Sequence, residues 1–129
     1  MDVHSHRDLI VWQKAMDLVV LVYRFTEQFP KSEIYGLSSQ MRRSAVSIPS
    51  NIAEGRKRGT RKDYRQFLLI AYGSGGELET QVEIAKRLTF GNEKDRLVVD
   101  QTLNEVMRML NVITSKLADP SNKPNKLTS

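Results

Sequence analysis

The sequence predicts an all-α fold, an antiparallel up-down-up-down four-helix bundle. Apolar residues recur at helical spacing over four long stretches, and only short segments separate these stretches. Short connections make consecutive helices antiparallel neighbours. A chain of 129 residues is long enough for one domain with its own core. We therefore expect a polar lead over residues 1–8, a bundle over 9–117 and a flexible tail over 118–129.

The first predicted helix covers about residues 9–29 and ends before Pro30, because the residue preceding a proline disfavours the α conformation. Ser5 and Asp8 have the spacing of a capping box, with Asp8 as an alternative cap. The helix carries two adjacent apolar rows, Leu9-Trp12-Met16-Val19-Tyr23 and Val11-Ala15-Leu18-Val22-Phe25-Phe29. This stripe is wider than one packing partner needs. Either the helix lies deep in the bundle, or one row faces another subunit.

The second predicted helix covers about residues 37–56 and contains Pro49. A proline in a helix interior removes one backbone hydrogen bond and bends the helix. Because the apolar spacing continues in phase across Pro49, we favour one kinked helix over a break. A polar row runs beside the apolar stripe: Gln40, Ser47, Asn51 and Glu54. It is either a solvated face or a hydrogen-bonded seam that fixes the register of the helix.

The third predicted helix covers about residues 61–90. It follows a turn bracketed by Gly55 and Gly59, and Thr60 and Asp63 form a capping box at its start. Three glycines lie in its middle: Gly73, Gly75 and Gly76. Because each costs about 1 kcal/mol relative to alanine in a helix interior, they imply a close approach of two helices, or a bend.

The fourth predicted helix follows Gly91 and Asn92, a helix stop and an N-cap. Glu93 and Asp95 lie in its first turn, where their negative charge is stabilising beside the positive end of the helix dipole. Its apolar row continues to about residue 117: Leu103, Val106, Leu110, Ile113 and Leu117.

Several features indicate a cytoplasmic protein. The chain has no cysteine, which fits a reducing compartment and excludes disulfides and thiolate sites. Its N-terminus lacks the charged-then-apolar layout of a signal peptide. The longest apolar run, residues 18–23, is far shorter than the ~20 residues that a membrane span needs.

The sequence lacks the residue patterns of common catalytic and cofactor sites. Its two histidines, His4 and His6, have no carboxylate or cysteine partners at metal-ligand spacing. The carboxylates of residues 77–83 have no histidine near them, unlike those of di-metal bundles. The glycines of residues 73–76 are not followed by Gly-Lys-Ser/Thr, so no P-loop is present. We expect a protein that is not an enzyme and that holds no metal or cofactor.

Positive charge is concentrated around the turn between the second and third predicted helices. The chain has a net charge of +5, and residues 37–66 alone hold eight Lys or Arg against two acidic residues, a net +6. A localised positive field suits polyanions such as RNA, DNA or an acidic protein face. The candidate nucleic-acid-binding residues are Arg56, Lys57, Arg58, Arg61, Lys62 and Arg65 at the turn, with Arg42 and Arg43 as a separate pair.

The same cations also suit an ordinary solvated surface. Those before the turn lie near a helix C-terminus, where positive charge is favoured in any case, and Arg42 or Arg43 could pair with carboxylates of the bundle. Those after the turn open a helix and oppose its dipole, which favours a functional role. Tyr64 and Tyr72 could stack on RNA bases, although Tyr64 also fits the core.

Several longer motifs resemble a known bacterial family. They are Trp12-Gln13-Lys14-Ala15, Phe29-Pro30, Tyr35-Gly36-Leu37, Gln40-Met41-Arg42-Arg43, Ser47-Ile48-Pro49-Ser50-Asn51-Ile52-Ala53-Glu54-Gly55, Ala71-Tyr72-Gly73-Ser74 and Glu77-Leu78-Glu79. In these motifs the chain is similar to four-helix-bundle proteins related to the 23S ribosomal RNA intervening-sequence proteins. The resemblance covers about residues 9–117.

The resemblance implies a ring-like homopentamer, and kinship with the accessory proteins of diversity-generating retroelements, basic pentameric bundles that bind a reverse transcriptase and nucleic acid. We therefore expect a non-enzymatic oligomer that binds RNA or another nucleic acid through the basic turn, with no membrane or small-molecule partner. The alternative is a protein-interaction adaptor that docks an acidic partner such as a reverse transcriptase.

Overall fold

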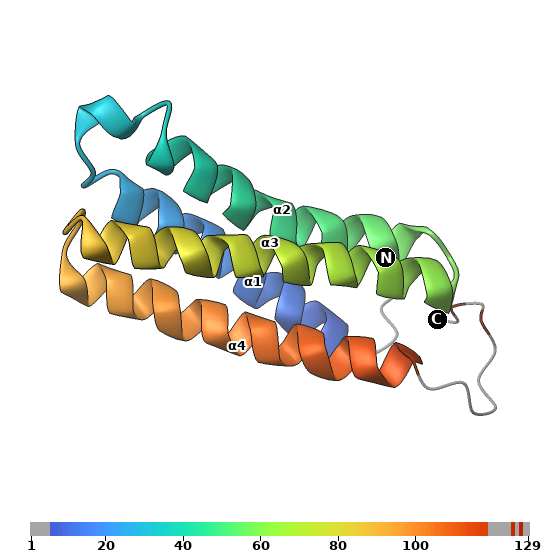
Figure 1. Ribbon diagram of the computed structural model, residues 1–129. Helices are drawn as coiled ribbons and strands as arrows, with labels where there is room; N and C mark the ends of the chain where they lie inside the picture. The colour runs from blue at the N-terminus through green and yellow to red at the C-terminus, as the bar shows by residue number, and fades with distance from the viewer. Residues whose placement is uncertain (1–5, 119–124, 126, 128–129) are drawn as a thin grey trace.

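The computed structural model describes residues 6–118, 125 and 127, with the side chains of residues 8–118, 125 and 127. It contains four long helices, α1 (His6–Thr26), α2 (Leu37–Lys57), α3 (Arg61–Arg87) and α4 (Glu93–Ala118), and a short 3-10 helix, η1 (Lys31–Glu33). Consecutive long helices run in opposite directions (Figure 1). The predicted all-α up-down-up-down bundle is confirmed.

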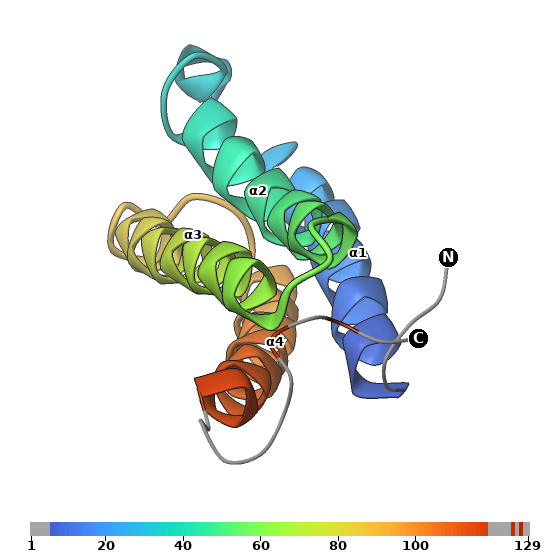
Figure 2. The same cartoon turned by 90° about the vertical axis from the view of Figure 1, so that its right-hand side faces the viewer.

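The four helices follow one another around the bundle, and α4 closes it against α1 (Figure 2). The α2–α3 pair has the most extensive contact. None of the described helices combines the length and the apolar character that crossing a membrane requires.

The two apolar rows of α1 have different environments. One row lies in the core, where Val11, Ala15, Leu18, Val22 and Phe25 have no exposed surface. The other row is partly open to solvent: Trp12 and Val19 are half-buried, whereas Leu9, Met16 and Tyr23 are exposed. The alternative of a deeply buried α1 is therefore wrong for this chain alone, and an apolar row remains on its surface.

The start of α1 differs from the prediction. Asp8 lies inside the first turn of the helix and is buried, so it does not cap the helix. A buried carboxylate needs a charged or hydrogen-bonding partner, and Arg56 of α2 supplies a guanidinium 3.9 Å away. Ser5, the other half of the predicted capping box, lies outside the described residues.

Two helices end three residues earlier than predicted. α1 ends at Thr26, whose hydroxyl donates to the carbonyl of Val22 at 2.8 Å. Phe29 is nevertheless buried in the turn that follows, with its ring edge-on to that of Phe25, 5.1 Å between centroids. α3 ends at Arg87, and Gly91 adopts the positive φ of +74° that reverses the chain into α4.

α2 continues through Pro49 without interruption, so the alternative of a break is wrong. Side chains beside the proline donate to carbonyls one turn earlier: Ser50 to Val46 at 2.7 Å and Asn51 to Ser47 at 2.8 Å. Such bonds are typical of helix positions where the regular backbone ladder is perturbed.

Half of the predicted polar row is a hydrogen-bonded seam. The Ser47 hydroxyl lies 2.7 Å from that of Ser74 on α3, and the Asn51 amide donates to the Ser47 hydroxyl at 3.0 Å. Gln40 and Glu54, at the ends of the row, are exposed. The seam therefore fixes the register of α2 against α3 at one level only.

Glycines allow close helix packing at two levels. A methyl group added at Gly55 of α2 would lie 2.6 Å from the Cβ of Phe67, and one added at Gly75 of α3 would clash with Met107 of α4. Gly73 and Gly76 face open space instead. The predicted close approach is thus confirmed for Gly75 alone among the three glycines in the middle of α3.

The predicted caps at the α3 and α4 starts are present. Thr60 accepts a hydrogen bond from the backbone N–H of Asp63 at 3.1 Å, and Asn92 accepts one from Asp95 at 2.7 Å. Of the predicted tail, Asn125 and Leu127 are described, and they lie beside the turn between α2 and α3. Residues 119–124, 126, 128 and 129 lie outside the described part.

Gly55→Ala is expected to lower the free energy of unfolding by about 1–3 kcal/mol, because the new methyl group meets a Cβ that only a backbone shift can move. Gly73→Ala is the matched control: the space around it is open, so helix propensity should raise stability by about 0.5–1 kcal/mol. Urea titration followed by circular dichroism measures both changes. Equal effects would contradict the packing difference.

Candidate nucleic-acid interface

The turn between α2 and α3 is short, and both helix ends are locally satisfied. The N–H of Arg58 donates to the carbonyl of Gly55 at 3.2 Å, and Thr60 caps α3. Gly59 between them has a φ of +88°, a conformation that glycine adopts without strain. The turn therefore presents cations from both helices at one end of the bundle.

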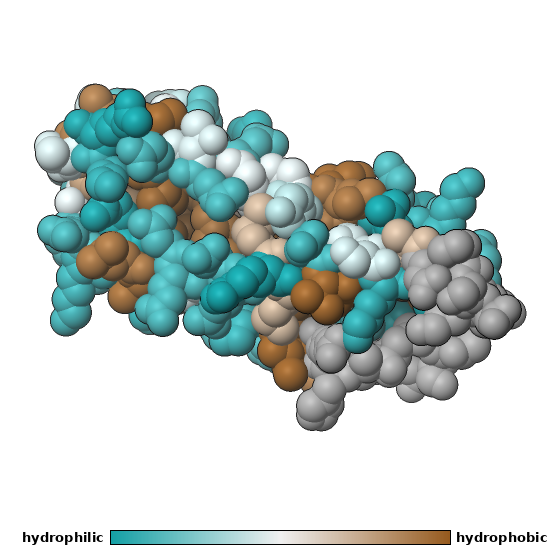
Figure 3. Space-filling model, turned by 60° about the horizontal axis from the view of Figure 1, so that its bottom comes forward, coloured by the Kyte–Doolittle hydropathy of each residue, from teal (hydrophilic) through white to brown (hydrophobic). Residues whose placement is uncertain are grey.

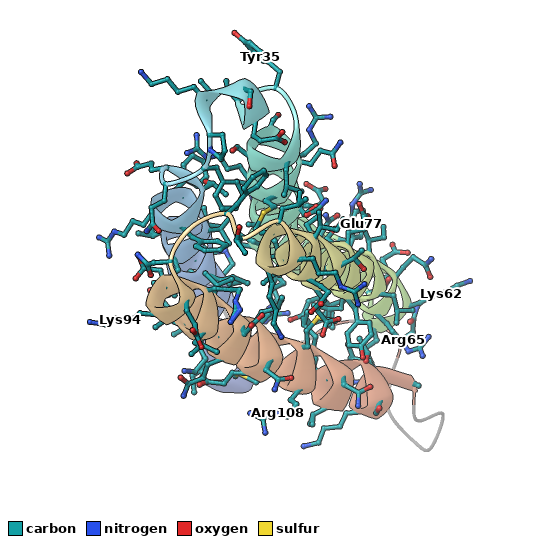
Figure 4. The ribbon with its side chains drawn as sticks, turned by 60° about the vertical axis from the view of Figure 1, so that its left-hand side comes forward. Tyr35, Lys62, Arg65, Glu77, Lys94 and Arg108 are labelled. Carbon is teal, nitrogen blue, oxygen red and sulfur yellow. The ribbon has the colours of Figure 1, made fainter. Side chains whose placement is uncertain are left out.

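Three cations of the turn face solvent: Lys57, Arg58 and Lys62. Arg58 pairs with Glu54 one helical turn earlier at 3.1 Å, and its guanidinium lies 4.8 Å from the centre of the Phe67 ring. Its side chain is still half exposed. Figure 4 shows Lys62 reaching outward from α3 on the same side of the bundle as Arg65. We call Lys57, Arg58 and Lys62 the turn patch.

Arg61 and Arg65 are half-buried and bind the end of α4. Arg61 donates to the carbonyl of Lys116 at 3.2 Å, and Arg65 donates to the carbonyl of Thr114 at 3.1 Å. The last carbonyls of a helix carry its negative dipole end, so cations are stabilising there. These two arginines oppose the dipole of their own helix but serve that of its neighbour, which weakens the argument for a functional role.

Arg56 does not belong to the surface at all. It is 8% exposed, pairs with Asp8 of α1 and lies over the ring of Tyr64, 5.6 Å from its centre. The prediction of Arg56 as a phosphate ligand is therefore not compatible with its position. Burial, with the nearby Asp8 carboxylate, raises the pKa of the Tyr64 hydroxyl well above its ordinary value, so Tyr64 is neutral.

A cavity of about 200 Å³ lies next to this buried cluster. Its remaining wall is apolar and comes from α1 and α2: Leu9, Trp12, Ile52 and Ala53. Sequence reasoning missed the cluster because Asp8 and Arg56 are far apart in the chain, and Asp8 had a local interpretation as a cap.

Arg42 and Arg43 form a separate location, as predicted. Arg42 donates to the Thr26 hydroxyl at 2.8 Å, and its guanidinium lies 4.6 Å from the centre of the Tyr23 ring. It therefore stabilises the C-terminus of α1 rather than pairing with a carboxylate. Arg43 is exposed.

The geometry gives little support to aromatic stacking on RNA bases or to metal binding. Tyr64 is a core residue, and Tyr72 is exposed two turns further along α3. In the described part of the chain, no three His, Cys, Asp or Glu side chains gather in a way that would hold a metal ion. His4 and the side chain of His6 lie outside that part.

Comparison with known proteins points to one family. A sequence model of the family described as 23S rRNA-intervening sequence protein matches residues 7–112. None of the curated proteins matches the chain. The fold is similar to the crystal structure of a protein of unknown function from the S23 ribosomal protein family of Bacteroides thetaiotaomicron VPI-5482. The TM-score is 0.76 at 24% sequence identity, over 84% of this chain and 98% of that chain.

Asp8→Ala is expected to lower the free energy of unfolding by about 3 kcal/mol or more, because it removes the carboxylate from a buried guanidinium. Glu83→Ala is the control, since it breaks an exposed pair with Arg87 and should cost much less. Urea titration measures both. A loss for Asp8→Ala as small as that of the control would show that the buried pair does not stabilise the junction of α1 and α2.

Proposed function

Because the chain belongs to the 23S rRNA-intervening sequence protein family, we propose that it is a non-enzymatic oligomer that binds RNA through the turn patch. The observation that supports this best is the location of the charge. Residues 37–66 hold a net charge of +6, more than the +5 of the whole chain, and three of these cations remain exposed at one end of the bundle. The family description refers to 23S rRNA, so RNA is the first polyanion to test.

The chemistry of the turn patch suits phosphate. The planar guanidinium of Arg58 matches two phosphate oxygens, and the ammonium groups of Lys57 and Lys62 add charge without a fixed geometry. Arg61 and Arg65 keep their positive charge while bonded to α4, so they extend the field behind the patch. Contacts of this kind bind the nucleic-acid backbone and carry no base specificity.

Three exposed cations per chain bind a polyanion weakly, so the proposal includes an oligomer. α1 presents apolar side chains to solvent, with Val20 47% exposed beside Leu9 and Met16, and its neighbour α4 exposes Leu97 and Val112. Figure 3 shows apolar residues, in brown, reaching the surface at several places along the bundle. Exposed apolar surface of this extent is typical of protein interfaces. By resemblance, we propose a homopentamer.

The triple variant Lys57→Ala/Arg58→Ala/Lys62→Ala is expected to weaken binding of a labelled single-stranded RNA about tenfold or more. Because each lost phosphate contact removes about 0.7 from the slope of log K against log salt, the slope should fall by about 2 per RNA segment bound. Fluorescence anisotropy from low to moderate salt measures both quantities.

The matched control is Arg24→Ala/Lys31→Ala/Lys94→Ala, which removes three exposed cations from the opposite end of the bundle. It should retain the wild-type affinity. Equal weakening by both variants, or no RNA binding by the wild type at low salt, would rule out the turn patch as an RNA site. Equal affinity for polyglutamate and RNA would favour an acidic protein partner instead.

Val20→Glu is expected to convert the oligomer to a 14.8 kDa monomer, because it places a charge on the exposed apolar side of α1. Gln40→Glu, the same charge change at an exposed site of α2, should leave the oligomer intact. Size-exclusion chromatography with light scattering gives the mass. A wild-type monomer would refute the pentamer.

A further inference from the structure

The two described residues of the C-terminal tail are bonded to the α2–α3 turn. The backbone carbonyl of Asn125 accepts a hydrogen bond from the N–H of Arg61. Its side-chain oxygen accepts one from the N–H of Lys62 at 2.9 Å. Two residues later, the N–H of Leu127 donates to the carbonyl of Gly59 at 2.8 Å. The tail is thus attached to both sides of the turn at Thr60.

These bonds use the groups that start α3. The first N–H groups of a helix have no partner within the helix. Here Asn125 takes those of Arg61 and Lys62, and Thr60 takes that of Asp63. Leu127 adds an apolar anchor, since it is half-buried and packs against the core. Polar and apolar contacts together hold Asn125 and Leu127 at the turn that joins the cations of α2 to those of α3.

We propose that Asn125 and Leu127 form an intramolecular strap that competes with RNA for the turn patch, an inference that rests on the proposed function. The strap is bonded to the backbone of Lys62, whose side chain belongs to the patch, and to Gly59, which follows Arg58. The side chains of Arg58 and Lys62 stay exposed beside the docked strap, so a single phosphate can reach either of them. A phosphodiester chain that bridges both cations runs across the turn that Asn125 and Leu127 occupy, and it therefore competes with the strap.

The strap is weak enough to open. It is held by three hydrogen bonds and one half-buried leucine, and each such bond contributes little once the lost bonds to water are counted. Ordering Asn125 and Leu127 opposes these gains through lost conformational entropy. The docked and open states are therefore close in free energy, and a polyanion of modest affinity shifts the equilibrium towards the open state.

If the tail acted by its charge alone, its effect on RNA affinity would be opposite to that of a competing strap. Residues 119–129 contain Lys123 and Lys126 against Asp119, a net +1. A tail that acts only by its charge attracts RNA, so undocking or removing it leaves affinity unchanged or lower. A strap that occupies the turn between the patch cations lowers affinity, so undocking it raises affinity. The sign of the change in RNA affinity therefore distinguishes a competing strap from a tail that acts only by its charge.

The test uses the full chain with Asn125→Ala/Leu127→Ser, which removes the side-chain bond and the apolar anchor without changing the net charge. If the strap is docked in about four molecules of five, RNA affinity should rise about fivefold in the variant. The control Lys123→Ala/Lys126→Ala removes the charge of the tail and keeps both strap residues. It should bind RNA no more tightly than the wild type.

Hydrogen exchange of the Arg61 and Lys62 amides gives a second measurement that needs no RNA. Both amides should exchange faster in Asn125→Ala/Leu127→Ser than in the wild type, and equal exchange would refute the docked strap. Faster exchange with unchanged RNA affinity would overturn the competition while leaving RNA binding intact. If neither protein binds RNA, the proposed function fails, and the competition fails with it.

Discussion

The close packing of α2 on α3 at Gly55 is the contact on which this end of the molecule depends. With no side chain at Gly55, the helix backbones approach to the level of the Phe67 Cβ just before α2 ends. The next residue, Arg56, is buried between Asp8 of α1 and the ring of Tyr64. Arg58 then lies over the Phe67 ring at the surface. One short segment thus separates a cation that joins three helices from a cation that faces solvent.

The bundle itself uses much of the positive charge that the sequence concentrates near the turn. In an antiparallel bundle, each helix N-terminus lies beside the C-terminus of a neighbour, so a cation that opposes its own dipole can stabilise the next helix. Arg65 of α3 does this for the C-terminal end of α4, and Arg42 of α2 does it for the C-terminal end of α1. Counting charges along the chain therefore overestimates the positive surface. The positive surface left for a partner is smaller than that count suggests, and it is defined by which cations are exposed rather than by residue type.

Local patterns predicted the helices, the cap at Thr60 and the continuity of α2 through Pro49, because spacing and capping act over one or two helical turns. The site was less predictable, because its contacts join distant parts of the chain. Asp8 has a local interpretation as a cap, and only the packing of α1 against α2 reveals its pairing with Arg56. The same holds for Asn125, because the composition of residues 118–129 predicts a flexible tail, although Asn125 binds the start of α3.

The turn patch and the apolar row of α1 depend on each other in the proposed function. Three phosphate contacts per chain give weak, salt-sensitive binding, whereas a ring of five chains offers about fifteen to one long RNA. A buried ion pair links the two surfaces: Asp8, which precedes Leu9 of the exposed row, pairs with Arg56, which precedes Lys57 of the turn patch. Assembly through α1 would therefore place one turn patch at a fixed position in every copy. In the proposed ring, a strap at each turn would act five times, so a small change in docking would have a large effect on the binding of a long RNA.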